Sequence, residues 1–123
     1  MIYRIALSST DGAVVNCHFG HSKQFLIAVV DTETGDYHFE STRNVIPCCS
    51  GRDHTDSAID SVLEALSDVQ AIMVCKIGNE AANYLEHKGM AVYEAPYPVE
   101  ELLKKITAEK IWEADKWQYL TKS

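Results

Sequence analysis

The sequence predicts a mixed α/β domain, and two patterns along the chain carry this prediction. Five short segments rich in apolar residues are typical of strands, and three others repeat apolar residues at the spacing of an amphipathic helix. They occur in the order strand, hairpin, helix, strand, helix, strand, helix. With 123 residues the chain has the size of one domain, and a domain of this size buries about two-thirds of the surface of its unfolded state.

The first half of the chain predicts one strand followed by an antiparallel hairpin. Ile2–Leu7 is an apolar run interrupted at Arg4, and polar turn residues follow it. Phe25–Val30 is almost continuously apolar, which is typical of a strand buried on both faces. Tyr37–Ser41 alternates between aromatic and polar residues after a loop that contains Gly35. A glycine-containing loop between two such runs indicates a hairpin.

Residues 44–54 predict a loop that leads into the first helix. Loops of about ten residues in compact domains are often functional. From Asp56 onward apolar residues recur at positions i, i+3, i+4 and i+7, and Thr55 or Asp56 is the expected N-cap. The apolar face of this helix consists of Ile59, Val62, Leu63 and Leu66.

Two more strands and two more helices are predicted in the second half. Ala71–Cys75 reads as a buried strand, and Asn79 is the expected N-cap of a helix over Glu80–Lys88. Gly89 is a natural C′ residue for that helix. Ala91–Glu94 is a short strand. Helices that connect successive strands imply parallel pairing, so with the front hairpin the sheet should be mixed.

The third helix and the segment after it close the chain. Pro98 suits the first turn of a helix. Its apolar face consists of Val99, Leu102, Leu103 and Ile106. The residues after Thr107 form a tail with Trp112 and Trp117, which we expect to pack rather than to stack on a nucleotide.

Composition excludes some classes of partner. The formal net charge is −7, and no basic cluster exceeds Lys104 and Lys105, so a nucleic-acid partner is not expected. No apolar run is long enough to span a bilayer, and no signal-peptide pattern is present. We therefore expect no membrane association and a cytoplasmic location. Its four cysteines are then expected to be ligands, reactive thiols or buried small groups rather than disulfides.

A run in the loop after the first strand concentrates metal-ligating side chains. Cys17, His18 and His21 supply one thiol and two imidazoles, which suit iron–sulfur species, zinc or copper. Gly20 between the histidines allows close approach of the backbone to a ligand. A plainer interpretation stays open, in which Phe19 packs into the core and both histidines face solvent.

Further thiols and a histidine follow downstream. Cys48 and Cys49 are neighbours, and neighbouring side chains on an extended backbone point to opposite sides, so they suit a multinuclear cluster, or one ligand and one buried thiol. His54 stands just before a predicted helix, where anions also bind, or is a solvated loop residue. Cys75 ends a buried strand, a place that faces the ligand crevice in many α/β sheets, although cysteine is also often buried.

Several of these motifs together resemble a known family. The run His18-Phe19-Gly20-His21-Ser22 is followed by Gln24-Phe25-Leu26-Ile27, Pro47-Cys48, Ile77-Gly78, Leu85 to Gly89 and Val99-Glu100-Glu101-Leu102. In order and spacing they resemble the dinitrogenase iron–molybdenum cofactor biosynthesis family, a nitrogenase accessory domain. This domain occurs as small NifX-type proteins and as the C-terminal domain of NifB-type proteins. The resemblance covers a domain over residues 1–107 and leaves a tail over 108–123.

The resemblance implies a fold and a set of ligands. It implies a ribonuclease H-like motif, with three α/β/α layers around a five-stranded mixed sheet. The cluster-binding histidine of the family corresponds to His18, and a loop cysteine of some NifB-type members corresponds to Cys48. Cys17 and Cys49 are not fixed parts of the family pattern, so their involvement rests on chemistry alone. The radical-enzyme cysteine motif of NifB-type proteins does not occur in this sequence, so that activity is not implied.

The leading hypothesis is a non-enzymatic carrier in nitrogenase-type cofactor assembly. The cargo would be an iron–sulfur cluster, the FeMo-cofactor or its precursor, bound transiently. His18 and Cys48 would be the metal ligands and His21 a second or outer ligand, with Cys17, Cys49 and His54 as further candidates. Cofactor-assembly or acceptor proteins would be its partners. The oligomeric state stays open, including a dimer through the tail.

Two other hypotheses remain beside it. The same residues could form a mononuclear zinc or copper site of a metal-binding or metal-sensing module unrelated to nitrogen fixation. Alternatively, Cys48 or Cys49 could act as a nucleophile assisted by His54. A nuclease is not expected, because a two-metal nuclease needs acidic residues on the first strand and Ile2–Leu7 has none.

Overall fold

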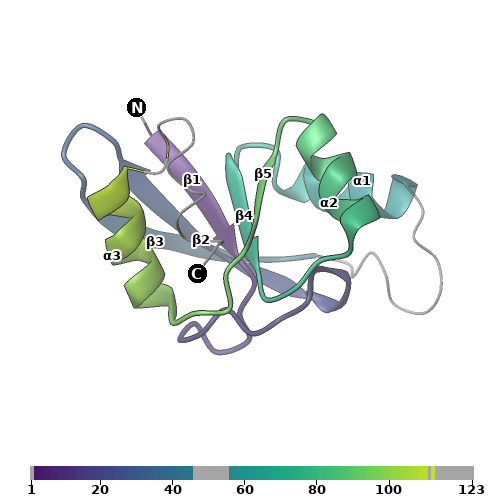
Figure 1. The fold of residues 1–123 in the computed structure, drawn as a ribbon, viewed down its shortest axis with the longest axis horizontal. Coiled ribbons are helices and arrows are strands. Elements are labelled where there is room, and N and C mark those ends of the chain that lie inside the picture. Colours follow the sequence, from purple (N-terminus) through teal and green to yellow (C-terminus); the bar gives the residue numbers. More distant parts are fainter. Residues whose placement is uncertain (1, 46–55, 111, 113–123) are drawn as a thin grey trace.

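The computed structural model describes residues 2–45, 56–110 and 112 and shows a mixed α/β architecture (Figure 1). The elements in chain order are β1 (Ile2–Leu7), η1 (Phe19–His21), β2 (Gln24–Asp31), β3 (Tyr37–Asn44), α1 (Asp56–Ala65), β4 (Ala71–Val74), α2 (Asn79–His87), β5 (Ala91–Glu94) and α3 (Val99–Glu109). The predicted order of strands and helices is confirmed. Within the described residues no helix has the length and apolar character needed to cross a membrane.

The five strands form one mixed sheet in the order β3-β2-β1-β4-β5. β1 is central, pairing antiparallel with β2 and parallel with β4. β3 continues the antiparallel side and β5 the parallel side. Since β1 and β4 run in the same direction, both end at the same edge of the sheet, and the loop after β1 begins there.

Helices cover both faces of the sheet, which gives three layers. Figure 1 shows α3 on one side of the sheet and α1 with α2 on the other. The core on the α3 side is built mainly from β1, β4 and α3, through Ile5, Leu7, Met73, Leu103 and Ile106. The core on the other side includes Phe25, Ile27, Leu66, Ile72 and Leu85. Full burial of each such side chain contributes roughly 1.5–3 kcal/mol.

Several local predictions differ from the structure by a few residues, including the bounds of β2 (Gln24–Asp31) and α2 (Asn79–His87). β4 ends at Val74 rather than Cys75, and β3 continues to Asn44 because it stays paired with β2 up to Gln24. The N-cap of α2 is Gly78 rather than Asn79. Gly78 has the extended backbone that a cap requires, and its carbonyl oxygen accepts the first helical hydrogen bond from Ala82 at 3.0 Å.

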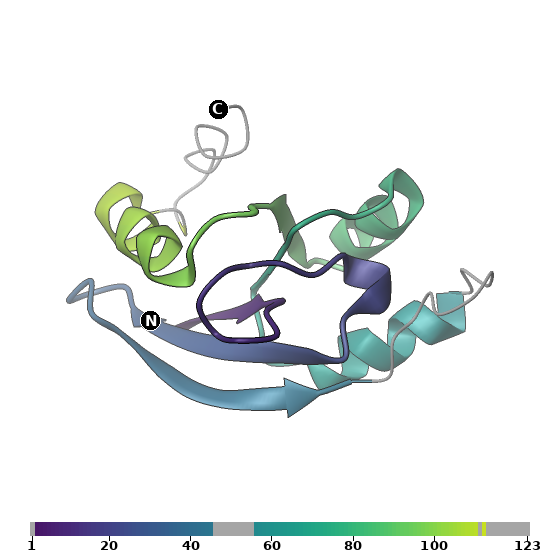
Figure 2. The ribbon, with the colours of Figure 1, turned by 90° about the horizontal axis from the view of Figure 1, so that it is seen from below.

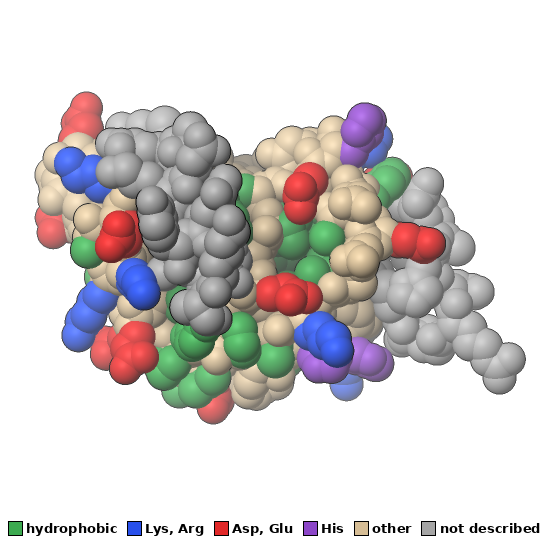
Figure 3. Space-filling model, in the orientation of Figure 1, with side chains coloured by type: hydrophobic (Ala, Val, Ile, Leu, Met, Phe, Trp, Pro, Cys, Tyr) green, Lys and Arg blue, Asp and Glu red, His purple; other side chains and the backbone are tan. Residues whose placement is uncertain are grey.

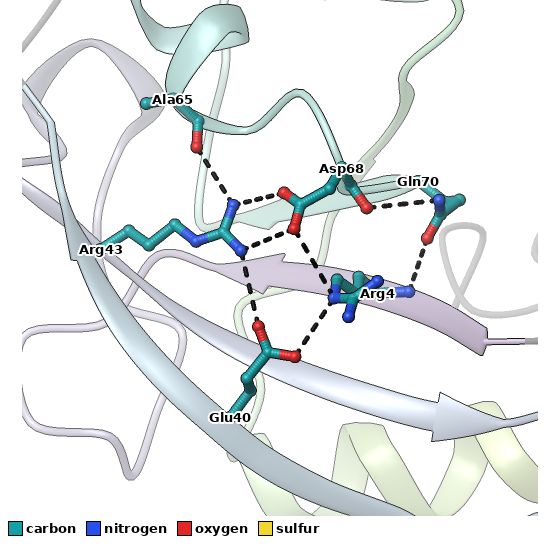
Figure 4. Close-up of polar contacts among 6 residues, drawn as sticks. All are labelled: Arg4, Glu40, Arg43, Ala65, Asp68 and Gln70. Carbon is teal, nitrogen blue, oxygen red and sulfur yellow. Dashed lines mark hydrogen bonds and ion pairs between the residues drawn. The ribbon is translucent and has the colours of Figure 1, made fainter.

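An ion-pair network ties the edge strand β3 to the rest of the domain (Figure 4). Arg43 on β3 pairs with Asp68, which follows α1, and also donates to the carbonyl oxygen of Ala65 at 3.1 Å. Arg4 on β1 donates to Glu40 on β3 at 3.2 Å. The Arg43 guanidinium lowers the pKa of Asp68 to about 2. Oppositely charged groups thus satisfy one another across three elements.

The residue Trp112 extends the core beyond α3. Its ring lies 6.3 Å from the ring of Tyr3, centroid to centroid, and it packs against the core on the α3 side. The pKa of Tyr3 is raised by its burial. The prediction that Trp112 packs is confirmed, and Trp117 lies outside the described residues.

Candidate functional site

The run Cys17–His21 lies in the loop between β1 and β2, across the edge of the sheet where β1 and β4 end (Figure 2). Phe19 is only 2% exposed and packs into the core between the sheet, α1 and α2. The flanking residues His18 and His21 are exposed. The aromatic side chain therefore anchors the run while the two imidazoles remain at the surface, as the plainer interpretation predicts, and ligand binding by the two histidines stays a prediction.

Backbone hydrogen bonds join this run to the residues after β4. His18 forms a parallel bridge with Lys76. The N–H of Phe19 donates to the carbonyl oxygen of Lys76 at 2.9 Å. The loop after β1 thus continues the sheet beside β4, and this pairing places His18 next to Lys76.

Two buried serines fix the backbone at His18. Ser22 and Ser8 are 1% and 0% exposed. The Ser22 hydroxyl donates to the carbonyl oxygen of His18 at 2.9 Å and is itself hydrogen-bonded to the Ser8 hydroxyl. Buried hydroxyl groups require partners. This chain of hydroxyls supplies them and holds the loop against the end of β1.

Asp11 organises the earlier part of the same loop. Its carboxylate accepts hydrogen bonds from the backbone N–H groups of Ala13 at 2.8 Å and Val14 at 3.3 Å. These bonds lower the pKa of Asp11. A side chain of the loop therefore helps to fix its backbone conformation.

His18 and His21 open onto one hollow of about 530 Å³. Their rings lie 6.1 Å apart, centroid to centroid, at an interplanar angle of 61°. In Figure 3, histidine side chains gather with cationic side chains at the lower right of the molecule. The hollow is lined by His18, Phe19, Gly20, His21, Lys76, Ile77, Gly78, Asn79, Glu80 and Ala81.

The start of α2 forms the opposite wall of this hollow. Because its N-cap is a glycine, no side chain caps the first turn. The first N–H groups of a helix have no partner inside the helix and carry partial positive charge. Lys76 adds a full positive charge, and Glu80 is the acidic residue of the first turn. The turn before α2 is braced by Glu94, which accepts from the N–H of Ile77 at 2.9 Å.

Cys17 lines a second, smaller hollow of about 290 Å³ with Thr10, His21, Lys23 and Gln24. His21 contributes to both hollows and stands between them. The Cys17 thiol donates to the side-chain oxygen of Asn16 at 3.3 Å. Cys17 is therefore close to His21 but does not line the hollow that holds both histidines.

The structure brings together part of the predicted ligand set. His18 and His21 meet, with Cys17 beside them, whereas Cys48, Cys49 and His54 lie outside the described residues. In residues 2–45, 56–110 and 112, no three His, Cys, Asp or Glu side chains lie close enough to hold one metal ion. Among those residues a metal ion would therefore find at most two such side chains together.

Sequence reasoning missed Lys76 and the open first turn of α2. The turn Ile77-Gly78-Asn79 between a buried strand and a helix was the available signal. This turn does not predict the bridge between His18 and Lys76, because that pairing joins segments far apart in the chain.

Solved structures share this fold of a five-stranded mixed sheet with helices on both faces. PH0822 superposes with a TM-score of 0.63 at 22% identity, covering 94% of this chain and 97% of that chain. MJ0327 of Methanocaldococcus jannaschii superposes with a TM-score of 0.57 at 20% identity, covering 88% and 90%. At these identities the likeness establishes the fold alone.

Residues 1–109 match the family described as dinitrogenase iron–molybdenum cofactor. The FeMo cofactor biosynthesis protein NifB of Frankia alni is 32% identical over 108 residues, which are 85% of this chain and 20% of that protein. The NifB of Azotobacter vinelandii is 30% identical over 112 residues, 87% of this chain and 22% of that protein. The chain spans about a fifth of the length of these curated relatives. It belongs to the dinitrogenase iron–molybdenum cofactor family, so the resemblance is confirmed.

Proposed function

We propose that this chain takes part in FeMo-cofactor biosynthesis as a non-enzymatic carrier. Its cargo is an iron–sulfur cluster, either the FeMo-cofactor or a precursor, held reversibly in the hollow between η1 and α2. Membership of the family and likeness to proteins named for FeMo cofactor biosynthesis support the pathway. Cofactor-assembly or acceptor proteins in the cytoplasm would deliver and receive the cargo.

The observation that carries the proposal is the convergence of two histidines on one hollow. His18 and His21 are exposed, their backbone is fixed by Phe19 and Ser22, and both line the same 530 Å³ space. Neutral imidazole is a suitable ligand for iron near neutral pH. A fixed backbone with accessible rings allows a cluster to bind and leave without unfolding the loop.

The charge of the hollow supports an anionic cargo. Iron–sulfur clusters with sulfide and thiolate ligands generally carry net negative charge, and net charge is one of the factors that set their potential. Lys76 and the open first turn of α2 supply positive charge in an otherwise acidic protein of net charge −7. Glu80 in the same lining offsets the charge of Lys76, so the attraction for an anion rests on the open N–H groups of the first turn and on the position of Lys76 beside His18.

A small number of protein ligands fits a carrier that must release its cargo. The described residues supply at most two ligating side chains at one place, since no group of three occurs among them. Cys48 would add a thiolate if its loop reaches the same edge of the sheet. A cargo that keeps most of its own sulfide ligands can pass to an acceptor by exchange of one or two bonds.

Anaerobic reconstitution with an iron–sulfur donor tests the proposal. Bound iron and visible absorption are measured for the parent protein, His18→Ala, His21→Ala and Cys48→Ala. His87→Ala is the matched control, because His87 is exposed at the far end of α2, away from the hollow. We expect the control to load like the parent, His18→Ala to lose most of the cluster, and the other two variants to lose part of it.

Two results would overturn the carrier proposal. If His18→Ala binds as much iron as the parent, the cluster is not held in this hollow. If the purified parent carries stoichiometric zinc and resists cluster loading, the chain is a mononuclear metal-binding module instead. The circular dichroism spectrum of each variant confirms that a loss of iron does not come from unfolding.

A further inference from the structure

Cys17 and Cys75 are brought side by side by the pairing of the front loop with the residues after β4. The N–H of Cys75 donates to the carbonyl oxygen of Cys17 at 2.9 Å, and the next residues, His18 and Lys76, form the parallel bridge. Neighbouring strands lie about 4.8 Å apart, so the two cysteine Cα atoms are about 5–6 Å apart. A disulfide needs Cα atoms about 4.4–6.8 Å apart, so this spacing permits one.

The alternation of side chains places both thiols on the same face. His18 and Lys76 are bridge partners and line the same hollow, so they share one face. The residue before each of them, Cys17 on one segment and Cys75 on the other, points to the opposite face. Met73, two residues before Cys75, belongs to the core on the α3 side, which gives the same orientation for Cys75.

An independent line of reasoning places the Cys17 thiol on that face. Cys17 lines the smaller hollow together with Gln24 of β2. Leu26, two residues further along β2, packs against the core on the α3 side, so Gln24 shares that face. Cys17 therefore lies between β2 and β4 with its side chain on the α3 side, next to Cys75.

Both thiols are free and partly accessible. Each is half-buried and neither is in a disulfide. Cys17 is reached from solvent through the smaller hollow, and its thiol donates to the side-chain oxygen of Asn16 at 3.3 Å, a hydrogen bond that a thiol makes only weakly. Half-burial of this kind leaves Cys17 open to a small reagent, and the backbone hydrogen bond between the two residues keeps Cys75 next to it.

We propose that Cys17 and Cys75 form a reversible disulfide by exchange with a low-molecular-weight disulfide such as oxidised glutathione. The Cys17 thiolate attacks one sulfur of glutathione disulfide, whose S–S bond breaks and releases one glutathione thiolate. The Cys75 thiolate then attacks the Cys17 sulfur and expels the second glutathione thiolate. The protein loses two electrons and two protons, and two molecules of reduced glutathione form.

This bond would act on the rim of the larger hollow. It would tie the loop after β1 covalently to the end of β4, directly beside His18 and Lys76. A cross-link between segments far apart in the chain restricts the unfolded state, so the oxidised protein should have the higher Tm. This inference goes beyond the proposed function, because a disulfide between Cys17 and Cys75 does not depend on cluster binding. It can be tested without a cluster.

The test uses a Cys48→Ser/Cys49→Ser background, in which Cys17 and Cys75 are the remaining cysteines. The protein is incubated with oxidised glutathione, quenched in acid, alkylated and analysed by intact mass and non-reducing peptide mapping. We expect a mass lower by two hydrogens, no alkylation, and a peptide that joins residues 17 and 75. Adding Cys17→Ser or Cys75→Ser should abolish this peptide and leave a stable glutathione adduct on the remaining thiol.

Two outcomes would overturn the proposal. Accumulation of protein with two glutathione adducts would show that the thiols cannot meet, and full alkylation after incubation would show that they do not react. If the background variant does not fold, the parent is mapped in the same way, and pairing of Cys17 with any cysteine other than Cys75 contradicts the inference. His18→Ala should still form the disulfide, so its failure to load a cluster is distinguishable from failure here.

Discussion

Two polar regions of this domain use their charges in opposite ways. In the ion-pair network of Arg4, Glu40, Arg43 and Asp68, every charge faces an opposite charge within the chain. At the histidine hollow, His18, His21 and Lys76 form no ion pair with another described residue, and the first turn of α2 has no side-chain cap. Within the described residues, the charges of the first region are paired with one another, and those of the second are not.

The difference separates residues that hold the fold from residues that are available to a ligand. The network ties β3 to β1 and to the turn after α1, and its charged groups are hydrogen-bonded to one another. The histidines are instead held by their backbone, through Phe19 and Ser22, while their rings stay open. Changes to the network should therefore alter stability alone, and changes at the hollow should alter binding, unless they reach the anchors beneath it.

The largest expected effect comes from the anchor Phe19. Phe19→Ala removes a side chain that is 2% exposed in the core against α1 and α2, and such a truncation costs about 3–5 kcal/mol. Urea unfolding gives the free energy of unfolding. Phe39→Ala is the matched control, since Phe39 is 46% exposed on β3, and it should cost about 1 kcal/mol or less. Equal losses in the two variants would show that Phe19 does not anchor the loop.

Substitution within the buried pair Ser8 and Ser22 should lower the free energy of unfolding by a smaller amount. Ser22→Ala removes the donor to the carbonyl oxygen of His18 and leaves the Ser8 hydroxyl buried without this partner, at a cost of about 1–3 kcal/mol. The double variant Ser8→Ala/Ser22→Ala leaves no orphaned hydroxyl, so its loss should be less than the sum of the two single losses. Additive losses in the urea-derived free energies would contradict the coupling.

The ion-pair network should contribute less to the free energy of unfolding than the serine pair, and its contribution should depend on pH. The pKa of Asp68 falls from 3.8 to about 2 because of Arg43, so the pair stabilises the fold above pH 3.8 and loses this contribution as pH falls toward 2. Asp68 is 45% exposed, so Asp68→Asn should cost no more than about 1 kcal/mol at pH 7. The difference between parent and variant, measured by urea unfolding, should shrink as pH falls toward 2 and vanish below that pH. A difference that persists there would show a contribution other than charge.

The fold was largely readable from the sequence because it depends on local patterns. Alternation and continuity of apolar residues located the strands, and the spacing of Val99, Leu102 and Ile106 located α3. The cap of α2 was misplaced because Asn79 is the better capping residue by type, whereas the backbone at Gly78 has the required conformation. At this position the conformation of the turn between β4 and α2 determined the cap, and the capping preference of the residue type did not.

The candidate site was readable only in part, because it is made by long-range pairing. The spacing of His18 and His21 within one run placed them together. The approach of Lys76 to His18, and of Cys75 to Cys17, depends on the loop after β1 taking a place beside β4. No local pattern encodes that placement, whereas buried Phe19 and Ser22, seen in the structure, explain it.

Substitution of Lys76 should have the smallest effect on stability. It should also separate the two regions most clearly, because it should change binding without changing stability. Its side chain is exposed and lines the hollow, so Lys76→Ala should leave the free energy of unfolding almost unchanged. It should weaken cluster loading by about two- to fivefold at low salt, the effect of an exposed charge pair worth roughly 0.5–1 kcal/mol. Added salt should shrink the difference, because it screens exposed charges. Lys105→Ala on α3 is the control of equal charge and should load like the parent; equal weakening in both would mean that net charge, rather than the hollow, attracts the cargo.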